Sequence, residues 1–378
     1  MSKIKHSKSL FLAVATSGLL AACNSGTSSP SQAAASISYA TFNNSAQQPG
    51  DDSGITGVRG VAGSNNVYIT GDFAVNNYSH GSLYVGPISG GGTYYNYDFP
   101  NSIAGTTVSA NNVYSADNYI SNNVELVGTY DIGGESALGY IYRGPIENNY
   151  TTTTGNEMYW QTLNAQTLDP TAKNTYPHSV MGNLVVGNYD NLITSGNAFI
   201  YNINNTSPHQ WKQLVLPGTP RTTTLYGVWY NGGTSYTLVG GLSDEAINVP
   251  ESQLQLSKAF IIDYDSVTES TSNFAAFTYL NQPSVVTHFE GITTDGGSGY
   301  NLSAMWLSQS GALGAAFANI TRNADNSFAL PTWINVEYPN AKMTTGDTVY
   351  QNYVLGVYSL ANENGVNSFV ATIPKSWY

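Results

Sequence analysis

A short apolar segment recurs along the chain and dominates its pattern of hydrophobic and polar positions. The clearest copy is Ser235–Leu242, Ser-Tyr-Thr-Leu-Val-Gly-Gly-Leu. Most copies carry a Gly followed closely by an aromatic residue or Leu. The other copies are Asn66–Phe73, Asn123–Tyr130, Asn183–Tyr189, Tyr300–Leu307 and Gln351–Tyr358. Such recurrence indicates a protein built from repeats.

The spacing of the repeats favours one architecture. The marker positions are Gly71, Gly128, Gly187, Gly240, Ser303 as a degenerate copy, and Gly356, with steps between 53 and 63 residues. Periods of this size are typical of propeller blades or β-arrays. Most repeats offer four candidate strands, which is the number in a propeller blade. The sequence therefore predicts an all-β, six-bladed propeller.

The first strand of each repeat starts with Thr and usually reaches a small residue four positions later. The predicted copies are Thr56–Val61, Thr107–Asn111, Thr175–Val180, Thr223–Val228 and Thr287–Ile292, with Met343–Asp347 as a departing sixth copy. The apolar segment is the second strand and a further apolar run is the third. The fourth strand is aromatic and often ends at Pro or Asn.

The two ends of the repeat region complement each other. The sixth repeat has only three strands, because the sequence stops at Tyr378, whereas Ile37–Asn43 matches the fourth-strand pattern and has no repeat of its own. We expect Ile37–Asn43 to pair beside Ser368–Ile373 and close the last blade, since propellers protect their sheet edges. An open solenoid is the alternative, and it leaves this complementarity unexplained. Residues 37–378 thus read as one domain.

Composition agrees with a β-rich extracytoplasmic protein. Charged residues make up 10% of the chain, while Gly (38) and Tyr (28) are abundant, which favours strands and turns. The net charge of −12 argues against nucleic acid as a partner. A single cysteine excludes an intramolecular disulfide and a cysteine-based zinc site.

The N-terminus carries that cysteine in a distinctive setting. Lys3, Lys5 and Lys8 precede the apolar run Leu10–Leu20, and Leu20-Ala21-Ala22-Cys23 follows. This segment resembles the lipobox of bacterial lipoproteins. The resemblance implies a signal peptide over residues 1–22, cleavage before Cys23, and diacylglycerol on its sulfur. An ordinary secretory signal that happens to contain Cys is the alternative.

The residues after the cysteine fit a membrane-anchored protein. Asn24 stands where lipoproteins held in the inner membrane tend to carry Asp, so the resemblance implies the outer membrane. Residues 23–36 are small and polar and read as the lipidated cysteine followed by a flexible tether. Two or more acyl chains give stable anchoring.

The repeats also resemble a known pattern. Thr223–Gly241 and Met181–Asp190 are similar to the HAF-type repeats of bacterial extracellular proteins, which run Thr…Gly-Ile/Val, then Val-Gly-x-Tyr, then an aromatic strand and Pro. The resemblance spans roughly residues 53–378. It implies an extracytoplasmic repeat fold and carries over no catalytic residue.

The candidate site follows from the channel that first strands line in a propeller. The positions just before the small residue are Arg59, Ala110, His178, Tyr226, Glu290 and Gly346, with Asp347 next. We expect Arg59, His178, Tyr226 and Glu290 to converge on one channel mouth as a ligand-binding site. A hydrogen-bonded plug of polar side chains is the alternative. Arg143 reads as a surface charge at a strand end.

The sequence alone fixes no biochemical activity. It contains no Gly-x-Ser-x-Gly, His-Glu-x-x-His or phosphate-loop motif, and it predicts no cofactor and no metal site. A lipid-anchored binding module for a glycan or protein ligand is the first interpretation. A carbohydrate-active hydrolase or lyase with Glu290 and His178 as an acid/base pair is the second, although glycosidases normally need paired acids. A structural envelope protein is the third.

Overall fold

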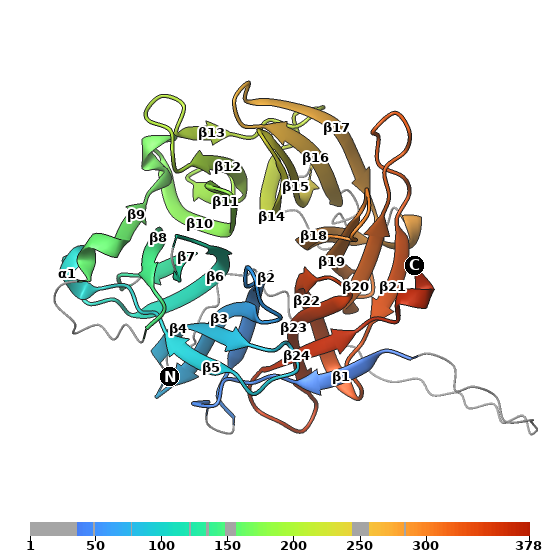
Figure 1. Ribbon diagram of the computed structural model, residues 1–378, viewed down its shortest axis with the longest axis horizontal. Helices are drawn as coiled ribbons and strands as arrows, with labels where there is room; N and C mark the ends of the chain where they lie inside the picture. The colour runs from blue at the N-terminus through green and yellow to red at the C-terminus, as the bar shows by residue number, and fades with distance from the viewer. Residues whose placement is uncertain are drawn as a thin grey trace, which may run out of the picture.

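The structure of the chain is a computed structural model that describes residues 36–47, 50–76, 78–120, 122–133, 136–147, 156–243, 257–282 and 285–378. The sheets stand around a central axis with their first strands innermost, as in a propeller (Figure 1). The chain is therefore an all-β propeller. The predicted signal peptide, Cys23 and the tether lie outside the described residues, apart from Ser36.

Four sheets have four antiparallel strands each. One contains β10 (Ala172–Met181), β11 (Leu184–Asn191), β12 (Asn197–Asn202) and β13 (Trp211–Gln213). The next contains β14 (Thr222–Gly232), β15 (Ser235–Ser243), β16 (Lys258–Asp265) and β17 (Ser270–Phe277). The third contains β18 (Val286–Thr294), β19 (Tyr300–Leu307), β20 (Leu313–Ile320) and β21 (Thr332–Val336). The fourth contains β22 (Ala341–Tyr350), β23 (Tyr353–Leu360), β24 (Asn367–Thr372) and β1 (Ser38–Thr41).

The remaining described strands form one eight-stranded sheet rather than two separate four-stranded sheets, so the described strands form five sheets and not the six predicted. Its first half is β2 (Ser53–Gly60), β3 (Val67–Val75), β4 (Tyr78–Gly86) and β5 (Thr93–Asn96). Its second half is β6 (Ala110–Asn118), β7 (Asn123–Asp131), β8 (Ala137–Pro145) and β9 (Trp160–Leu163). The halves are joined by a single parallel pair, Ser79 beside Ala110.

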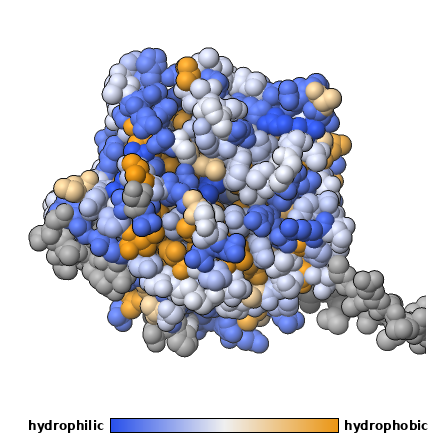
Figure 2. Space-filling model, in the orientation of Figure 1, coloured by the Kyte–Doolittle hydropathy of each residue, from blue (hydrophilic) through white to orange (hydrophobic). Residues whose placement is uncertain are grey.

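Helical segments in the described part of the chain are short. They are α1 (Asn101–Ala104) and the single 3₁₀ turns Glu157–Tyr159, Ala165–Thr167, Tyr279–Asn281 and Lys375–Trp377. None of these described segments has the length or the apolar content needed to cross a bilayer. The face shown in Figure 2 is mainly hydrophilic, with apolar residues scattered over it.

The predicted pairing of the N-terminal strand is confirmed. β1 is the outer strand of the last sheet and runs antiparallel to β24, with Ser38 beside Thr372 and Thr41 beside Phe369. Phe42 is buried and its ring lies 5.0 Å from that of Tyr84 in β4. The segment Ile37–Asn43 therefore contacts both the last sheet, through β24, and the eight-stranded sheet, through β4.

Every innermost strand carries one β-bulge at an equivalent position. The bulged residues are Thr56, Tyr114, His178, Tyr226, Glu290 and Asp347. A bulge leaves one residue out of the hydrogen-bond ladder, bends the strand and redirects the side chain. The six bulges therefore aim six different side chains toward the axis of the molecule.

The recurring glycine of the second strand is the counterpart of each bulge. A Cβ at these positions would collide with the carbonyl oxygen two residues before the bulge on the neighbouring strand. The glycines are Gly71, Gly128, Gly187, Gly240 and Gly356. In the fifth repeat the equivalent residue is Ala304, which pairs with Phe289, and not the predicted Ser303. Only a residue without a side chain gives the carbonyl this close approach.

In four of the inner strands, a polar residue three positions before the bulge ties neighbouring groups of four strands together. Asn111 Oδ1 accepts from Phe99 N at 2.8 Å, and Thr175 Oγ1 accepts from Ala165 N at 2.9 Å. The same contact recurs at Thr287, from Tyr279 N at 2.8 Å, and at Thr344, from Tyr338 N at 3.1 Å. Each bond satisfies a backbone donor where the outer strand of the preceding sheet ends.

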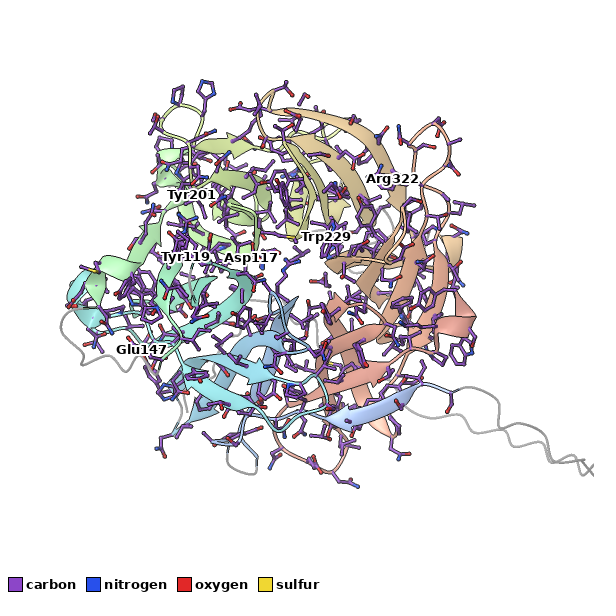
Figure 3. All side chains as sticks on the ribbon, viewed as in Figure 1. Asp117, Tyr119, Glu147, Tyr201, Trp229 and Arg322 are labelled. Carbon is purple, nitrogen blue, oxygen red and sulfur yellow. The ribbon has the colours of Figure 1, made fainter. Side chains whose placement is uncertain are left out.

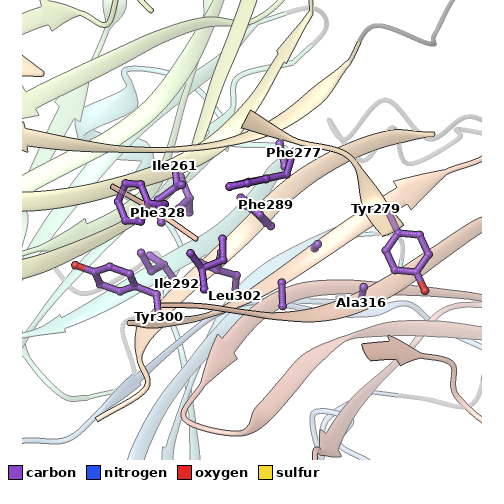
Figure 4. Close-up of a cluster of buried hydrophobic side chains, with 14 of the residues drawn as sticks. Ile261, Phe277, Tyr279, Phe289, Ile292, Tyr300, Leu302, Ala316 and Phe328 are labelled. Carbon is purple, nitrogen blue, oxygen red and sulfur yellow. The ribbon is translucent and has the colours of Figure 1, made fainter. Parts of the chain in front are cut away.

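The apolar core is divided among the contacts between neighbouring groups of strands. Figure 4 shows one such cluster, in which Phe277 and Ile261 pack against Phe289 and Leu302. Burial of a side chain of this kind contributes about 2–3 kcal/mol. Because each sheet supplies side chains to the clusters on both of its faces, no sheet is stable without its neighbours.

Removal of the N-terminal strand tests its role in this packing. A chain that begins at Asp51 should lose at least about 3 kcal/mol of unfolding free energy relative to one that begins at Ser36, because Phe42 and the β1–β24 hydrogen bonds are lost. Thermal and urea unfolding of the two chains would measure the difference. Equal midpoints would contradict the importance assigned to β1.

Candidate functional site

The four residues predicted to converge at the channel do line one cavity. Arg59, His178, Tyr226 and Glu290 come from β2, β10, β14 and β18, and Thr56 and Tyr114 join them. Their role as a ligand-binding set stays a prediction. The cavity is narrow, about 20 Å³, which is room for roughly one water molecule.

Only three of the four predicted residues occupy equivalent positions. Arg59 lies three residues beyond the bulge of its strand, so Thr56 is the true counterpart of His178. The counterparts in the second and sixth repeats are Tyr114 and Asp347, rather than Ala110 and Gly346. The predicted alignment is wrong in these three repeats, because it places Thr56, Thr107 and Met343 three residues before the bulge. The residues found three positions before the bulge are Ser53, Asn111 and Thr344.

Aromatic side chains pack against one another at the channel centre. His178 lies between Tyr114 and Tyr226, with ring centroids 4.9 and 4.7 Å away, and Tyr226 is also 6.1 Å from His288. His178 Nε2 is 2.7 Å from Asn188 Oδ1. Aromatic packing of this kind holds side chains in fixed positions. The channel centre is therefore a packed belt and not an open passage.

A much larger cleft lies away from the axis, between the β14–β17 sheet and the β18–β21 sheet. Its volume is about 420 Å³, within the range of ligand sites in proteins. It is lined by Trp229, Asn231, Ser235, Asp263, Asn273, Thr294, Gly297, Ser298, Gly299, Tyr300, Arg322 and Asn326. We call it the rim cleft. Its residues come from β14–β19 and from the loops that join β18 to β19 and β20 to β21.

An ion pair supports the floor of the rim cleft. Arg322 donates from Nη2 to Asp263 Oδ1 at 2.6 Å and from Nη1 to Asp263 Oδ2 at 2.9 Å, so the pair is bidentate. The side chains are only 15% and 13% exposed. Burial disfavours the charge on Arg322, but its hydrogen bonds to Asp263 and Tyr300 outweigh this and raise its pKa. The guanidinium also lies 4.4 Å from the ring of Phe328.

Thr237 joins the ion pair to the cleft wall. Its buried hydroxyl donates to Asp263 Oδ1 at 2.8 Å and accepts from Asn231 Nδ2 at 2.9 Å. The hydroxyl of Tyr300 donates to Asn231 Oδ1 at 2.8 Å. Asn273 donates to Asp263 Oδ2 at 2.8 Å. These bonds hold the polar groups in place before any ligand arrives.

The rim cleft escaped the sequence analysis for a physical reason. Asp263 and Arg322 belong to different repeats, and no periodic position connects them. The available signal was the Gly-rich segment Asp295–Tyr300, in which Asp295 Oδ1 accepts from Gly297 N and Gly299 N and shapes the loop. A side-chain oxygen that binds nearby backbone N–H groups is typical of a built turn.

A second ion pair lies on the β7 and β8 strands. The sequence predicted a surface charge at Arg143, and the structure corrects this. Arg143 donates to the buried Glu125 at 3.1 Å and to Asn183 Oδ1 at 3.0 Å. Burial raises the pKa of Glu125 to about 7 although Arg143 opposes this shift. Figure 3 places nearby Asp117 and Tyr119 on the same side of the ring.

Among the described residues, no group of three His, Cys, Asp or Glu side chains is placed to hold a metal ion. The arrangement therefore offers two kinds of concavity: a closed polar belt at the centre and an open, preorganised cleft at the rim. The second has the size and the fixed polar groups of a binding site.

Comparison with known proteins adds no argument about the fold or the function of this chain. No family model matches the chain, and no curated protein matches it. Similar solved structures include a luciferin-regenerating enzyme, with 12% identity, 90% of this chain and 96% of that chain covered, and a TM-score of 0.40. The GH43 endo-arabinanase from Bacillus licheniformis has 10% identity, 84% and 92% coverage, and a TM-score of 0.35. An α-L-arabinanase from Penicillium chrysogenum has 6% identity, with 89% of this chain and 98% of that chain covered and a TM-score of 0.38. These likenesses assign neither activity nor ligand to this chain.

Two buried groups should give the protein opposing pH dependences. The pKa of Glu125 is raised to about 7 by burial, so its contribution to stability is present at low pH and lost as pH rises from about 4.5 to about 7. The unfolding free energy of Glu125→Gln should therefore rise by up to about 3 kcal/mol relative to that of the wild type as pH rises across that range. Urea unfolding at several pH values would measure this difference.

His288 supplies the control with the opposite sign. Burial lowers its pKa to about 4, so its contribution is lost as pH falls from about 6.5 to about 4. The unfolding free energy of His288→Gln should therefore rise relative to that of the wild type as pH falls through this range. A difference between Glu125→Gln and the wild type that stays constant from pH 4.5 to 7 would contradict the assignment of Glu125.

Proposed function

We propose that this protein is a lipid-anchored envelope propeller that binds its ligand in the rim cleft. The observation that carries the proposal is the contrast between the cavities: about 420 Å³ at the rim and about 20 Å³ at the centre. Ligand sites usually span 300–1,000 Å³ and present a few fixed polar groups. The hydrogen bonds around Asp263, Arg322 and Thr237 meet this description.

A carbohydrate-active hydrolase or lyase is the second candidate function, because two of the bulged residues are carboxylates. Glu290 and Asp347 occupy equivalent places on neighbouring inner strands, and glycosidases use paired acids. Both are buried, with 7% exposure each, and the central cavity is too small for a sugar ring. Binding at the rim cleft is therefore the better supported function.

The proposed ring has six units. The eight-stranded sheet counts as two blades, because one residue pair alone joins its halves and each half has its own bulge. The seam between the last and first blades is supported by Ser53 N donating to Val366 O at 2.9 Å, and by Ser53 Oγ lying 3.2 Å from Ser368 Oγ. An apolar cluster with Phe42, Ile55 and Leu355 spans the same seam.

The sequence Leu20-Ala21-Ala22-Cys23 supports a lipid anchor. An anchor at this end of the chain would orient the rim cleft relative to the membrane. The third strands of the sheets end on the face that carries the rim cleft, and Ser38 lies beside Thr372, where β24 ends. The described chain thus begins on the cleft face. A tether attached there keeps the cleft within reach of the membrane that holds the lipid, which is proposed to be the outer membrane.

Lipid attachment is tested at Cys23. The mature protein should begin with an acylated Cys23, seen by mass spectrometry of its N-terminal peptide. Cys23→Ser should leave the protein out of the membrane fraction, because no acyl chain remains to hold it. A wild-type protein that is soluble and begins at another residue would contradict anchoring.

Blocking the rim cleft tests the binding function. Ser298 is exposed on the loop that lines the cleft, so Ser298→Trp should fill the cleft at little cost in stability. Binding to glycan and peptide arrays should fall by at least about tenfold. Gln309→Trp is the matched control, because Gln309 is equally exposed in the β19–β20 turn at the opposite end of the same sheet.

Glu290→Gln separates binding from catalysis. Array ligands should be bound without turnover by the wild type and by this variant alike. Turnover by the wild type that disappears in Glu290→Gln would favour the hydrolase. Binding that survives Ser298→Trp unchanged would place the ligand elsewhere and contradict the proposal.

A further inference from the structure

We infer that the rim cleft takes an uncharged glycan, and this inference rests on the proposed binding function. The argument has three parts: the balance of charge in the cleft, the hydrogen-bonding groups along its walls, and the accessible aromatic ring at its side. Each part excludes a different class of ligand.

The lining carries no net charge to offer. Among the residues that the structure describes, Asp263 and Arg322 are the only charged ones that line the cleft, and they bind each other through two short hydrogen bonds. Asp263 also accepts from Thr237 and Asn273, while Arg322 also donates to Tyr300 at 3.1 Å. An anion or a cation would have to displace these partners and leave a buried charge unpaired, which is costly.

The polar groups suit hydroxyls. Asn231, Asn273 and Asn326 line the cleft with Ser235 and Ser298. An amide or a hydroxyl can donate and accept at once, and so can each hydroxyl of a sugar. Because Asn231 and Asn273 are already held by Thr237 and Asp263, their remaining groups are presented in fixed directions.

One accessible aromatic ring, that of the half-buried Trp229, supplies apolar surface beside these polar groups, whereas Tyr300 is only 5% exposed. Trp229 and Tyr300 belong to different sheets and line the same cleft. Trp229 is half-buried, and the guanidinium of Arg59 lies 5.5 Å from its ring, which keeps the indole in place from the channel side. Figure 3 shows Trp229 near the channel and Arg322 farther out along the cleft. Sugars present flat C–H faces between their hydroxyls, and rigid aromatic rings bind such amphipathic surfaces.

Calorimetric titration with defined probes tests the ligand class. The neutral probes are cellohexaose, maltohexaose and chitohexaose, hexagalacturonate is the anionic counterpart, and hexalysine is the cationic one. At least one neutral probe should bind, and the charged probes should bind at least about tenfold more weakly or not at all. Trp229→Ala should weaken neutral binding about tenfold.

Two further variants keep the result interpretable. Trp229→Phe preserves an apolar ring in the core contact and should retain part of the affinity even if Trp229→Ala fails to fold. Trp377→Ala removes an exposed Trp at the C-terminus and should leave binding unchanged. Circular dichroism melts establish that each variant is folded.

The outcomes separate the ligand class from the binding function. Tighter binding of hexagalacturonate or hexalysine that is lost in Ser298→Trp overturns the glycan class and preserves the cleft as a site. Neutral binding unaffected by Trp229→Ala and Trp229→Phe overturns the role of the ring. Probe binding that Ser298→Trp leaves intact, or no binding to any probe on arrays or in titration, overturns both the class and the function.

Discussion

The close approach between a carbonyl of the inner strand and a glycine of the second strand is the contact on which the rest of the structure depends. Each inner strand has one residue more than its partner at the bulge, and the carbonyl two residues earlier faces the place where a Cβ would stand. A side chain there would push the strands apart. Because the contact recurs in five of the six repeats, it fixes where each inner strand bends and which residue it turns toward the axis.

That constraint explains why the centre of the ring is closed. The six bulged residues are of five types, and they include His178 between two tyrosine rings and the buried carboxylates Glu290 and Asp347. Varied side chains can fill a channel of this size and satisfy one another, while identical charged ones would repel. The remaining freedom lies in the loops at the rim, where Asp263 and Arg322 meet from different sheets.

The sequence predicted the periodic parts of the structure and missed the parts built between repeats. The glycine positions, the outer strand Ile37–Asn43 and the equivalent places of His178, Tyr226 and Glu290 all follow from local spacing. The alignment failed where Asn111 or Ser53 replaces the opening Thr, because different side chains can satisfy the same backbone donor. The Asp263–Arg322 pair could not be predicted, since its members are 59 residues apart and come together only when the sheets pack.

The central claim is that the ring is a filled scaffold and that ligand binds at its rim. A crystal structure of the protein grown with the tightest-binding neutral oligosaccharide tests this most directly. The account predicts electron density for the sugar in the rim cleft against Trp229, with hydrogen bonds to the cleft amides and the central belt unchanged. Sugar density beside Glu290 and Asp347, with the packed rings of Tyr114, His178 and Tyr226 displaced, would contradict it.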